Sequence, residues 1–321
     1  MRLGPLLGFE QSFDTVVTVA QEMEAVGAGS VMLAEAGRSA VTQAAAVIAA
    51  TKSIEVGTYV ANAFARSPWL TGLTARDLDE MSGGIDSSKA LTAMRDFVEI
   101  VRQVIAAPVG SRVSYEGPVH QVKKWRASFA PYRDSVPVYL SASGPKMMQV
   151  AAEVSDGIGV GIMASVEFMR DTVRPNAFAA AQSVGREPEA LAFPMGALVS
   201  VNQNSELARN AAKASVCGLF HPVPHPYYDS QMRQQGFSET ADRLAELMPQ
   251  GKTAEAMRII PEEVIDTLTI SGTPAECARR IAEYEGVTEQ IVMMRVAQKD
   301  EALGVHAYEP IFELISETKS S

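Results

Sequence analysis

The hydrophobic residues of this chain recur with two alternating periods, and the alternation predicts its secondary structure. Short continuous apolar runs, typical of buried strands, are followed by longer runs in which apolar residues return every three or four positions, as on one face of a helix. In the first such helix, Val16, Ala20 and Met23 share a face. The pattern predicts seven strands, over residues 2–7, 30–34, 54–60, 136–141, 157–162, 191–201 and 290–296.

Two segments interrupt this rhythm. Residues 113–122, "VSYEGPVHQV", are two short β-like runs around Glu116-Gly117-Pro118, which is typical of a β-hairpin. Residues 219–270 are proline-rich at first and then predict several short helices. Elsewhere helices are predicted between the strands, over 13–26, 41–50, 68 to about 82, 91–105, 146–154, 166–184, 206–217, 274–284 and 302–315.

Alternating strands and helices of this size indicate a parallel sheet with crossover helices. An open doubly wound sheet and a (β/α)₈ barrel both have this pattern. An open dinucleotide-binding sheet should carry G-x-G-x-x-G after its first strand, whereas only Gly8-Phe9-Glu10 follows Leu7. We therefore expect an α/β fold of the (β/α)₈ TIM-barrel type as a single domain over residues 1–321, with an insertion at about 219–270.

Composition and charge limit the kinds of molecule that this protein is expected to bind. The net charge is −10 and no run of Lys and Arg exceeds two residues, so nucleic-acid binding, which needs a basic face, is not expected. Two cysteines, Cys217 and Cys277, are too few for a disulfide scaffold or a four-cysteine zinc site. Cys217 lies in an alanine-rich helical run and is expected to be a buried structural thiol. Without a signal-peptide pattern or an 18-residue apolar segment, we expect a cytoplasmic protein that does not enter membranes.

Chemistry in a (β/α)₈ barrel lies at the carboxyl ends of the strands, so the residues after each strand are the candidates. Glu35 follows the second strand and could bind a ligand or transfer a proton. It could equally form a salt bridge with Arg38 or lie near a helix N-terminus. Asn62 follows the third strand, where it is either a polar group at the barrel mouth or a turn residue.

The strand predicted at 136–141 is followed by Ala142-Ser143-Gly144-Pro145-Lys146 and then by a helix. A helix N-terminus presents unpaired N–H groups and a partial positive charge. Small residues let an anion approach that backbone, Pro145 in the first turn removes no useful donor, and Lys146 adds a cation. The segment is thus either a phosphate-binding turn or an ordinary strand-to-helix turn, for which Ser-Gly-Pro is also suitable.

His221 and His225 in "FHPVPHPYYD" have the spacing of a metal-binding pair, but we do not predict a metal site. Such a pair needs a helix to bring both rings to one face. Pro222, Pro224 and Pro226 oppose a helix there, and extended polyproline geometry would separate residues four apart by roughly 12 Å. The segment is better interpreted as a loop over the barrel mouth.

Four segments together resemble the luciferase-like monooxygenase superfamily. They are most similar to its branch of oxidoreductases that use the deazaflavin coenzyme F420, which includes methylenetetrahydromethanopterin reductase-like proteins. The segments are residues 35–68, residues 78–84 ("LDEMSGG"), residues 136–157 ("VPVYLSASGPKMMQVAAEVSDG") and residues 271–284 ("SGTPAECARRIAEY"). The resemblance extends over nearly the whole chain and implies a (β/α)₈ barrel with an insertion region.

The resemblance also implies roles for particular residues. The segment Ala142, Ser143, Gly144, Pro145 and Lys146 would bind the coenzyme phosphate through backbone amides. Glu35, as the candidate catalytic residue, would lie near the deazaflavin, with Asn62 at the same end. A non-proline cis peptide is expected near Tyr59-Val60-Ala61, where Val60 would support the face of the ring system at a strain of about 3–4 kcal/mol.

The chain departs from the family pattern at two places. Many members carry Asp-His after the second strand, where this chain has Glu35-Ala36, so a histidine proton donor is absent there. After "LDEMSGG" the family continues into a glycine-rich fourth strand, whereas Gly84 here runs directly into Ile85. Since a barrel that loses one inner strand should not close, either a segment is omitted from the sequence or the barrel is damaged, and we favour an omission.

These features predict an F420-dependent oxidoreductase that transfers a hydride between the coenzyme and a small organic substrate. One alternative is an FMN-dependent monooxygenase of the same superfamily, and another is a non-catalytic binding barrel. Residues 219–270 would shape the substrate pocket. The superfamily commonly forms dimers, so a homodimer is expected. The substrate itself does not follow from fold or coenzyme.

Overall fold

A computed structural model describes residues 1–8, 11–35, 38–61, 89–128, 130, 135–142, 144–298 and 304–320. The chain divides into two compact units. Unit 1 comprises Met1–Tyr59, Val160–Arg174 and Phe193–Ser321, and unit 2 comprises Val60–Gly159 and Pro175–Ala192.

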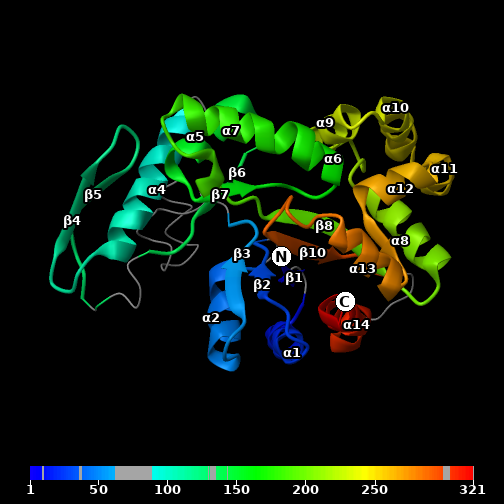
Figure 1. Cartoon of the computed structure of the whole chain (residues 1–321), viewed down its shortest axis with the longest axis horizontal. Helices are drawn as coiled ribbons and strands as arrows, with labels where there is room; N and C mark the ends of the chain where they lie inside the picture. Colours follow the sequence, from blue (N-terminus) through cyan, green and yellow to red (C-terminus); the bar gives the residue numbers. More distant parts are fainter. Residues whose placement is uncertain are drawn as a thin grey trace. The chain divides into compact units, whose positions relative to one another are not determined.

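Unit 1 is built on a parallel sheet of six strands (Figure 1). The last strand along the chain pairs with the first, from Arg2 opposite Gln290 to Pro5 opposite Met293, which is the pairing that a barrel needs in order to close. The order across the sheet is β3 (Glu55–Thr58), β2 (Ser30–Leu33), β1 (Arg2–Leu7), β10 (Gln290–Arg295), β8 (Met195–Val201) and β9 (Ile270–Gly272).

Helices of unit 1 begin at residues that the sequence marks as caps. Ser12, Ser39 and Asn204 each accept a backbone N–H in the first turn of their helices, and Thr273 forms a full capping box with Glu276. These residues precede α1 (Phe13–Ala25), α2 (Ala40–Ala50), α8 (Ser205–Gly218) and α13 (Pro274–Ala282). The unit also contains α6 (Val166–Phe168), the π-helical turn η3 (Met169–Val173), the 3₁₀ turn η6 (Val305–Tyr308) and α14 (Glu309–Ser320).

Close packing of β1 on β2 depends on Gly4. A Cβ atom at this position would lie 1.8 Å from the backbone oxygen of Ser30, so a larger residue would force the two strands apart. One face of this sheet carries a small apolar cluster of Leu6, Ala34 and Val292, against which Met32, Tyr59 and Met294 pack. Side chains from β1, β2, β3 and β10 therefore fill the same side of the sheet.

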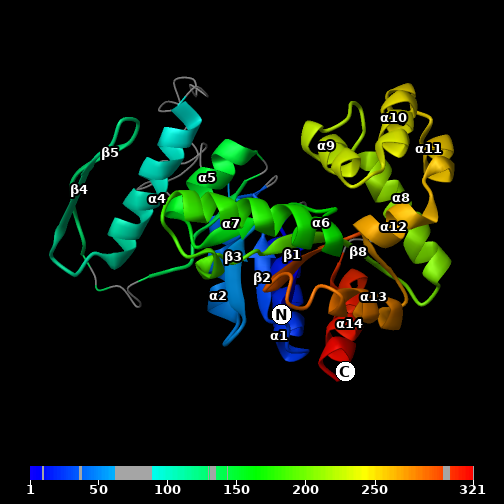
Figure 2. The ribbon, with the colours of Figure 1, turned by 45° about the horizontal axis from the view of Figure 1, so that its top comes forward.

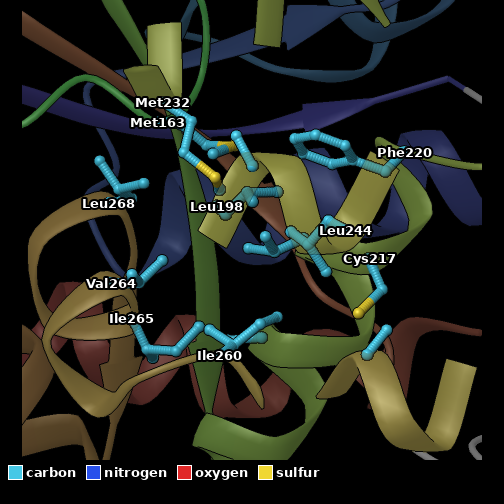
Figure 3. Close-up of a cluster of buried hydrophobic side chains, with 14 of the residues drawn as sticks. Met163, Leu198, Cys217, Phe220, Met232, Leu244, Ile260, Val264, Ile265 and Leu268 are labelled. Carbon is cyan, nitrogen blue, oxygen red and sulfur yellow. The ribbon is translucent and has the colours of Figure 1, made fainter. Parts of the chain in front are cut away.

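The inserted segment forms several short helices that pack on an apolar cluster shared with the sheet. Its helices gather beside α8 (Figure 2); they are α9 (Pro226–Gln234), α10 (Ser238–Leu247), the 3₁₀ turn η5 (Met248–Gln250), α11 (Thr253–Ile259) and α12 (Glu262–Leu268). Phe220, Met232 and Leu244 pack with Leu198 of β8 in one apolar cluster (Figure 3). Cys217 is fully buried in this cluster, which confirms its predicted structural role.

The described residues of unit 2 form an antiparallel hairpin, a short parallel strand pair and several helices. The hairpin joins β4 (Arg112–Glu116) and β5 (Gln121–Arg126), and the parallel pair is β6 (Tyr139–Ser141) with β7 (Gly157–Gly159). The helices are α4 (Ala90–Ala106), α5 (Pro145–Val154) and the 3₁₀ turn η4 (Pro188–Ala190), and α7 (Arg174–Ser183) enters the unit at Pro175.

A buried carboxylate fastens the hairpin to α4. Asp96 accepts backbone N–H groups of Val119 and His120 at 2.8 and 2.9 Å and the Tyr115 hydroxyl at 2.9 Å. Gly117 at the turn is packed so tightly that a Cβ atom would lie 2.4 Å from the Asp96 carboxyl. Burial raises the pKa of Asp96, but these three hydrogen bonds outweigh it and the net pKa is lowered.

Each predicted strand is present, although several are shorter than predicted. The strand predicted over 54–60 ends at Thr58, and that over 157–162 ends at Gly159. The helix predicted over 166–184 is helical throughout but contains the π turn η3. The strand β9 was not predicted. The helix predicted from 68, and the junction of Gly84 with Ile85, lie outside the described residues.

Glu24 on α1 offers a pH-dependent test of the fold. Hydrogen bonds from the backbone N–H groups of Ser53, Ile54 and Lys52 lower its pKa to about 2. Because the folded pKa lies below the unfolded value of about 4.3, this contribution to stability is complete above pH ~4.3 and is lost as the pH falls toward about 2. Glu24→Gln should therefore lower the Tm at pH 7.

The Tm difference between wild type and Glu24→Gln should shrink between pH 4 and pH 2, as measured by thermal unfolding at several pH values. Glu22→Gln, an exposed glutamate on the same helix, is the matched control and should leave the Tm nearly unchanged. A Tm difference that stays constant down to pH 2 would contradict the assignment.

Candidate functional site

The carboxyl ends of the parallel strands in unit 1 meet at one edge of the sheet, which is where α/β enzymes bind their ligands. Gly8 follows β1 at this edge with a φ of +108°. A Cβ atom there would lie 2.9 Å from the amide of Gln43 on α2 and 3.2 Å from the Ala34 oxygen. Glycine is thus required both by the backbone conformation and by the lack of space.

Glu35 lies at the same edge, two residues after the end of β2, and is partly buried. The preceding residue, Ala34, is fixed by an N–H···O hydrogen bond of 2.8 Å to Leu7 of β1. Arg38, the salt-bridge partner considered from the sequence, places its guanidinium over the Phe13 ring at 5.4 Å from the centroid. The sheet therefore holds the backbone of Glu35 at the edge where chemistry is expected.

Val60 begins unit 2 and is 53% exposed. The peptide bonds that join Tyr59 to Val60 and Val60 to Ala61 are trans, because the cis bond found among the described residues is His221–Pro222. The expected non-proline cis peptide is therefore wrong for these two bonds. A cis bond of this kind costs about 3–4 kcal/mol and persists where its surroundings fix it, whereas Val60 is open to solvent. Asn62 lies outside the described residues.

The turn between β6 and α5 brings four of the predicted phosphate-binding residues together in unit 2. Ala142 and Gly144 are partly buried, whereas Pro145 and Lys146 are exposed. Gly144 is the N-cap, with an extended backbone at φ −110° and ψ 154°, and Pro145 occupies the first helical position, as predicted. Ser143 lies outside the described residues.

No side chain of the described residues caps the N-terminus of α5. The first hydrogen bond of the helix runs from the Met148 N–H to the Gly144 oxygen at 2.9 Å, so the N–H groups of Lys146 and Met147 precede the helical ladder. A Cβ atom at Gly144 would meet no atom of the described residues within 4 Å. This turn has the donors, the helix dipole and the open space that an anion such as phosphate needs.

The segment that follows β7 has polar contacts that the sequence did not reveal. Within unit 1, the Tyr59 hydroxyl donates to the oxygen of Val160, and the Gly161 N–H donates to the Tyr227 hydroxyl at 3.2 Å. Burial raises the pKa of both tyrosines, so both hydroxyls are neutral at pH 7. A Cβ atom at Gly161 would lie 2.7 Å from the Tyr227 ring.

These contacts were missed because residues 220–229 were interpreted as a loop. The structure instead begins α9 at Pro226, where proline at the first helical position costs no hydrogen bond. The helix places Tyr227 against the residues that follow β7. The sequence signal available was the pair His225-Pro226, which is a suitable helix start.

Among the described residues, no group of three or more metal-binding side chains is found. In the same part of the chain, no helix is both long and apolar enough to cross a membrane.

Two sequence relatives cover most of the chain. A 5,10-methylenetetrahydromethanopterin reductase of Archaeoglobus fulgidus is 29% identical over 266 residues, which cover 75% of this chain and 77% of that protein. A protein of Mycobacterium tuberculosis with the provisional name coenzyme F420-dependent oxidoreductase is 26% identical over 339 aligned positions, which cover 93% of this chain and 96% of that protein.

The fold has a close counterpart among solved structures. The coenzyme F420-dependent tetrahydromethanopterin reductase of Methanopyrus kandleri superposes with a TM-score of 0.77 at 19% identity, covering 99% of this chain and 97% of that one. This likeness confirms the predicted α/β fold of the luciferase-like TIM-barrel type.

The chain also matches the sequence profile of a protein family. The sequence profile of luciferase-like monooxygenases matches residues 1–84 and 83–288. The two matched parts meet at Gly83-Gly84, where the sequence departs from the family pattern. Because the two parts together span most of the chain, this protein belongs to the luciferase-like monooxygenase family.

Proposed function

We propose that this protein is an F420-dependent oxidoreductase that transfers a hydride between the coenzyme and a small organic substrate. The observation that carries the proposal is the uncapped N-terminus of α5 with open space at Gly144. Relatives named as F420-dependent enzymes or as methylenetetrahydromethanopterin reductases support the identity of the coenzyme.

The residues of the β6–α5 turn fit the phosphate group of such a coenzyme. An anion at this turn gains hydrogen bonds from the backbone N–H groups of Lys146 and Met147 and interacts favourably with the helix dipole. The exposed Lys146 side chain adds a positive charge. A side chain at position 144 would occupy the space that the anion needs. The donor set therefore matches an anion without requiring a metal ion.

Other residues of the chain would orient the reactants. F420, when bound, would carry the hydride. Glu35 would hold or move a proton at the carboxyl edge of the sheet, and Val60 and Asn62 would contact the coenzyme near its ring. The helices α9 to α12 would shape the substrate pocket and keep water from it.

An FMN-dependent monooxygenase of the same family is the main alternative, and a non-catalytic barrel is the other. The β6–α5 turn alone distinguishes these alternatives weakly, because FMN also carries a phosphate. Oxygen consumption that depends on reduced FMN and the protein would favour the monooxygenase. Failure to bind either coenzyme would favour the non-catalytic barrel.

A substrate screen with reduced F420 tests the proposed reaction. The purified protein is incubated anaerobically with reduced F420 and a panel of small carbonyl and imine compounds, and the fluorescence of oxidised F420 is followed. We expect oxidation that requires both the protein and one class of substrate. Turnover with reduced FMN and oxygen, without any F420 turnover, would contradict the proposal.

We further propose a homodimer, which the family resemblance supports. Light scattering of the purified protein should give about twice the chain mass of 34.4 kDa. A monomeric mass at micromolar concentration would contradict this assembly.

A further inference from the structure

Three polar side chains are spaced four residues apart on one face of α9 and its C-cap: Tyr227 and Gln231 in the helix, and Gln235 at the C-cap. Residues with this spacing lie one above the other on a helix. The first and last of them contact the segment that follows β7, at Gly161 and at Met163 to Ser165. The spacing places Gln231 between these two contacting residues on the same helix face.

The two outer side chains both form hydrogen bonds. The Tyr227 hydroxyl accepts the Gly161 N–H at 3.2 Å. The Gln235 amide oxygen accepts the Ser165 N–H at 2.9 Å, and its nitrogen donates to the oxygens of Met163 at 2.8 Å and Gln231 at 3.1 Å. These bonds hold Met163 at a φ of +71°, which is uncommon for a side chain of its size.

Gln231 differs from both neighbours on this face. Its residue is only 3% exposed, and neither its amide nitrogen nor its amide oxygen has a hydrogen-bond partner among the described residues. A buried amide without partners is unfavourable, and such groups in native proteins point to a missing water, ion or ligand. Gln231 thus has both a donor and an acceptor available at a site closed to bulk solvent.

The position of this amide points to a ligand. The segment 160–165 follows the carboxyl end of a parallel strand, which is the edge where α/β proteins bind small molecules. Tyr59, from the end of β3, reaches the same segment through the Val160 oxygen. The polar groups that converge here therefore come from a strand end and from the inserted helix α9.

The absence of charge on the tyrosine hydroxyls and glutamine amides favours an uncharged ligand. Tyrosine hydroxyls and glutamine amides carry no net charge, and the charged residues of α9, Asp229 and Arg233, are paired with each other. A carboxylate or phosphate buried beside neutral dipoles would lack a compensating cation. An amide instead matches a ligand edge on which an N–H donor lies beside a C=O acceptor.

We propose that Gln231 is a ligand-recognition residue that binds such an N–H/C=O edge, of the kind found in lactams and cyclic imides. This inference deepens the proposed function. It rests on that function for the expectation that a ligand binds at the carboxyl ends of the strands. The edge could belong to the ring system of the coenzyme or to the substrate. The experiment below distinguishes these two sources.

The first measurement is the thermal stability of the protein without ligand. Gln231→Leu removes two unpartnered amide atoms, so its Tm should equal or exceed that of wild type. Gln235→Leu is the matched control, because it removes the same group from the same helix face but breaks three hydrogen bonds, and its Tm should fall. A fall for Gln231→Leu as large as that for Gln235→Leu would overturn the proposal, since a buried water would then satisfy the amide.

The second measurement is ligand binding, with 2-piperidone and oxidised F420 as probes followed by ligand-observed NMR and by fluorescence. Gln231→Leu should weaken one of the two at least tenfold. Loss of F420 binding would assign the edge to the coenzyme, and loss of 2-piperidone binding would assign it to the substrate. Unchanged binding of both probes, or no binding of either to the wild type, would overturn the proposal. A wild type that binds 2-piperidone through Gln231 but not F420 would contradict only the proposed function.

Discussion

Replacing Gly144 by aspartate should weaken F420 binding at least about 100-fold while leaving the protein as stable as wild type or slightly more stable. The backbone of Gly144 is extended, so any residue can adopt it, and a Cβ atom would meet no described atom within 4 Å. Aspartate at an N-cap accepts the N–H groups of the first turn and is preferred over glycine by a few tenths of a kcal/mol. The same carboxylate would take those N–H groups from the coenzyme phosphate and repel it.

The expected loss follows from the hydrogen bonds involved. Hydrogen bonds to a charged group contribute about 1.5–3 kcal/mol each, and about 1.4 kcal/mol corresponds to a tenfold change in Kd. Loss of the N–H groups of Lys146 and Met147 therefore predicts at least about a 100-fold change. Fluorescence titration gives the Kd, and thermal unfolding gives the stability.

Two variants at the same position provide the controls. Gly144→Ala adds only a methyl group and should reduce the affinity less than Gly144→Asp. Gly144→Ser caps the helix without a charge and should give an intermediate Kd. Unchanged F420 affinity in Gly144→Asp would show that the phosphate is bound elsewhere.

Replacing Glu35 by glutamine should lower kcat about 100-fold, in line with the usual contribution of a general acid or base. The residue follows the carboxyl end of β2 by two positions. Glutamine keeps its size but can neither donate a carboxyl proton nor accept one. The Kd for F420 should change by less than about threefold, because phosphate binding is assigned to a different segment. Steady-state kinetics with the substrate from the screen measure kcat.

Glu55 provides the matched control for this prediction. It is the first residue of β3 and therefore lies at the amino ends of the strands, where it is exposed beside Arg2. Glu55→Gln should leave kcat unchanged within about twofold. An equal fall of kcat in both variants, or a kcat in Glu35→Gln that matches wild type, would contradict a proton-transfer role for Glu35.

The sequence predicted well those elements whose structure is set by residues that are neighbours in the chain. The strand β1 was predicted over its full range because the uncharged, leucine-rich residues Leu3–Leu7 follow Arg2 and are bounded by Gly8. The start of α5 was predicted because Gly144 and Pro145 specify a strand-to-helix turn by their own conformational preferences. In both places, the residues that determine the structure can also be recognised in the sequence.

The elements that were missed depend on distant contacts. The strand β9 has only three residues, and its Ser271 and Gly272 also resemble the residues before a helix. It becomes a strand by pairing with Val199 to Val201 of β8, which lie about 70 residues earlier. Local propensity is a weak guide where such pairing decides.

The residues of the candidate site also divide into those that the sequence revealed and those that it did not. The β6–α5 turn was identified from its sequence, whereas Tyr227 and Gln231 were not, because three prolines hid the start of α9. The burial of Gln231 and its lack of partners are properties of the packed structure, and no local pattern indicates them. The trans bonds at Val60 correct an expectation that came from the family alone.

A paired titration can establish whether this chain uses the deazaflavin coenzyme. Purified protein is titrated with oxidised F420 and, separately, with FMN, and binding is measured by fluorescence quenching. We predict saturable binding of F420 that Gly144→Asp weakens, with FMN binding at least about tenfold more weakly. Saturable binding of FMN without binding of F420 would contradict the account.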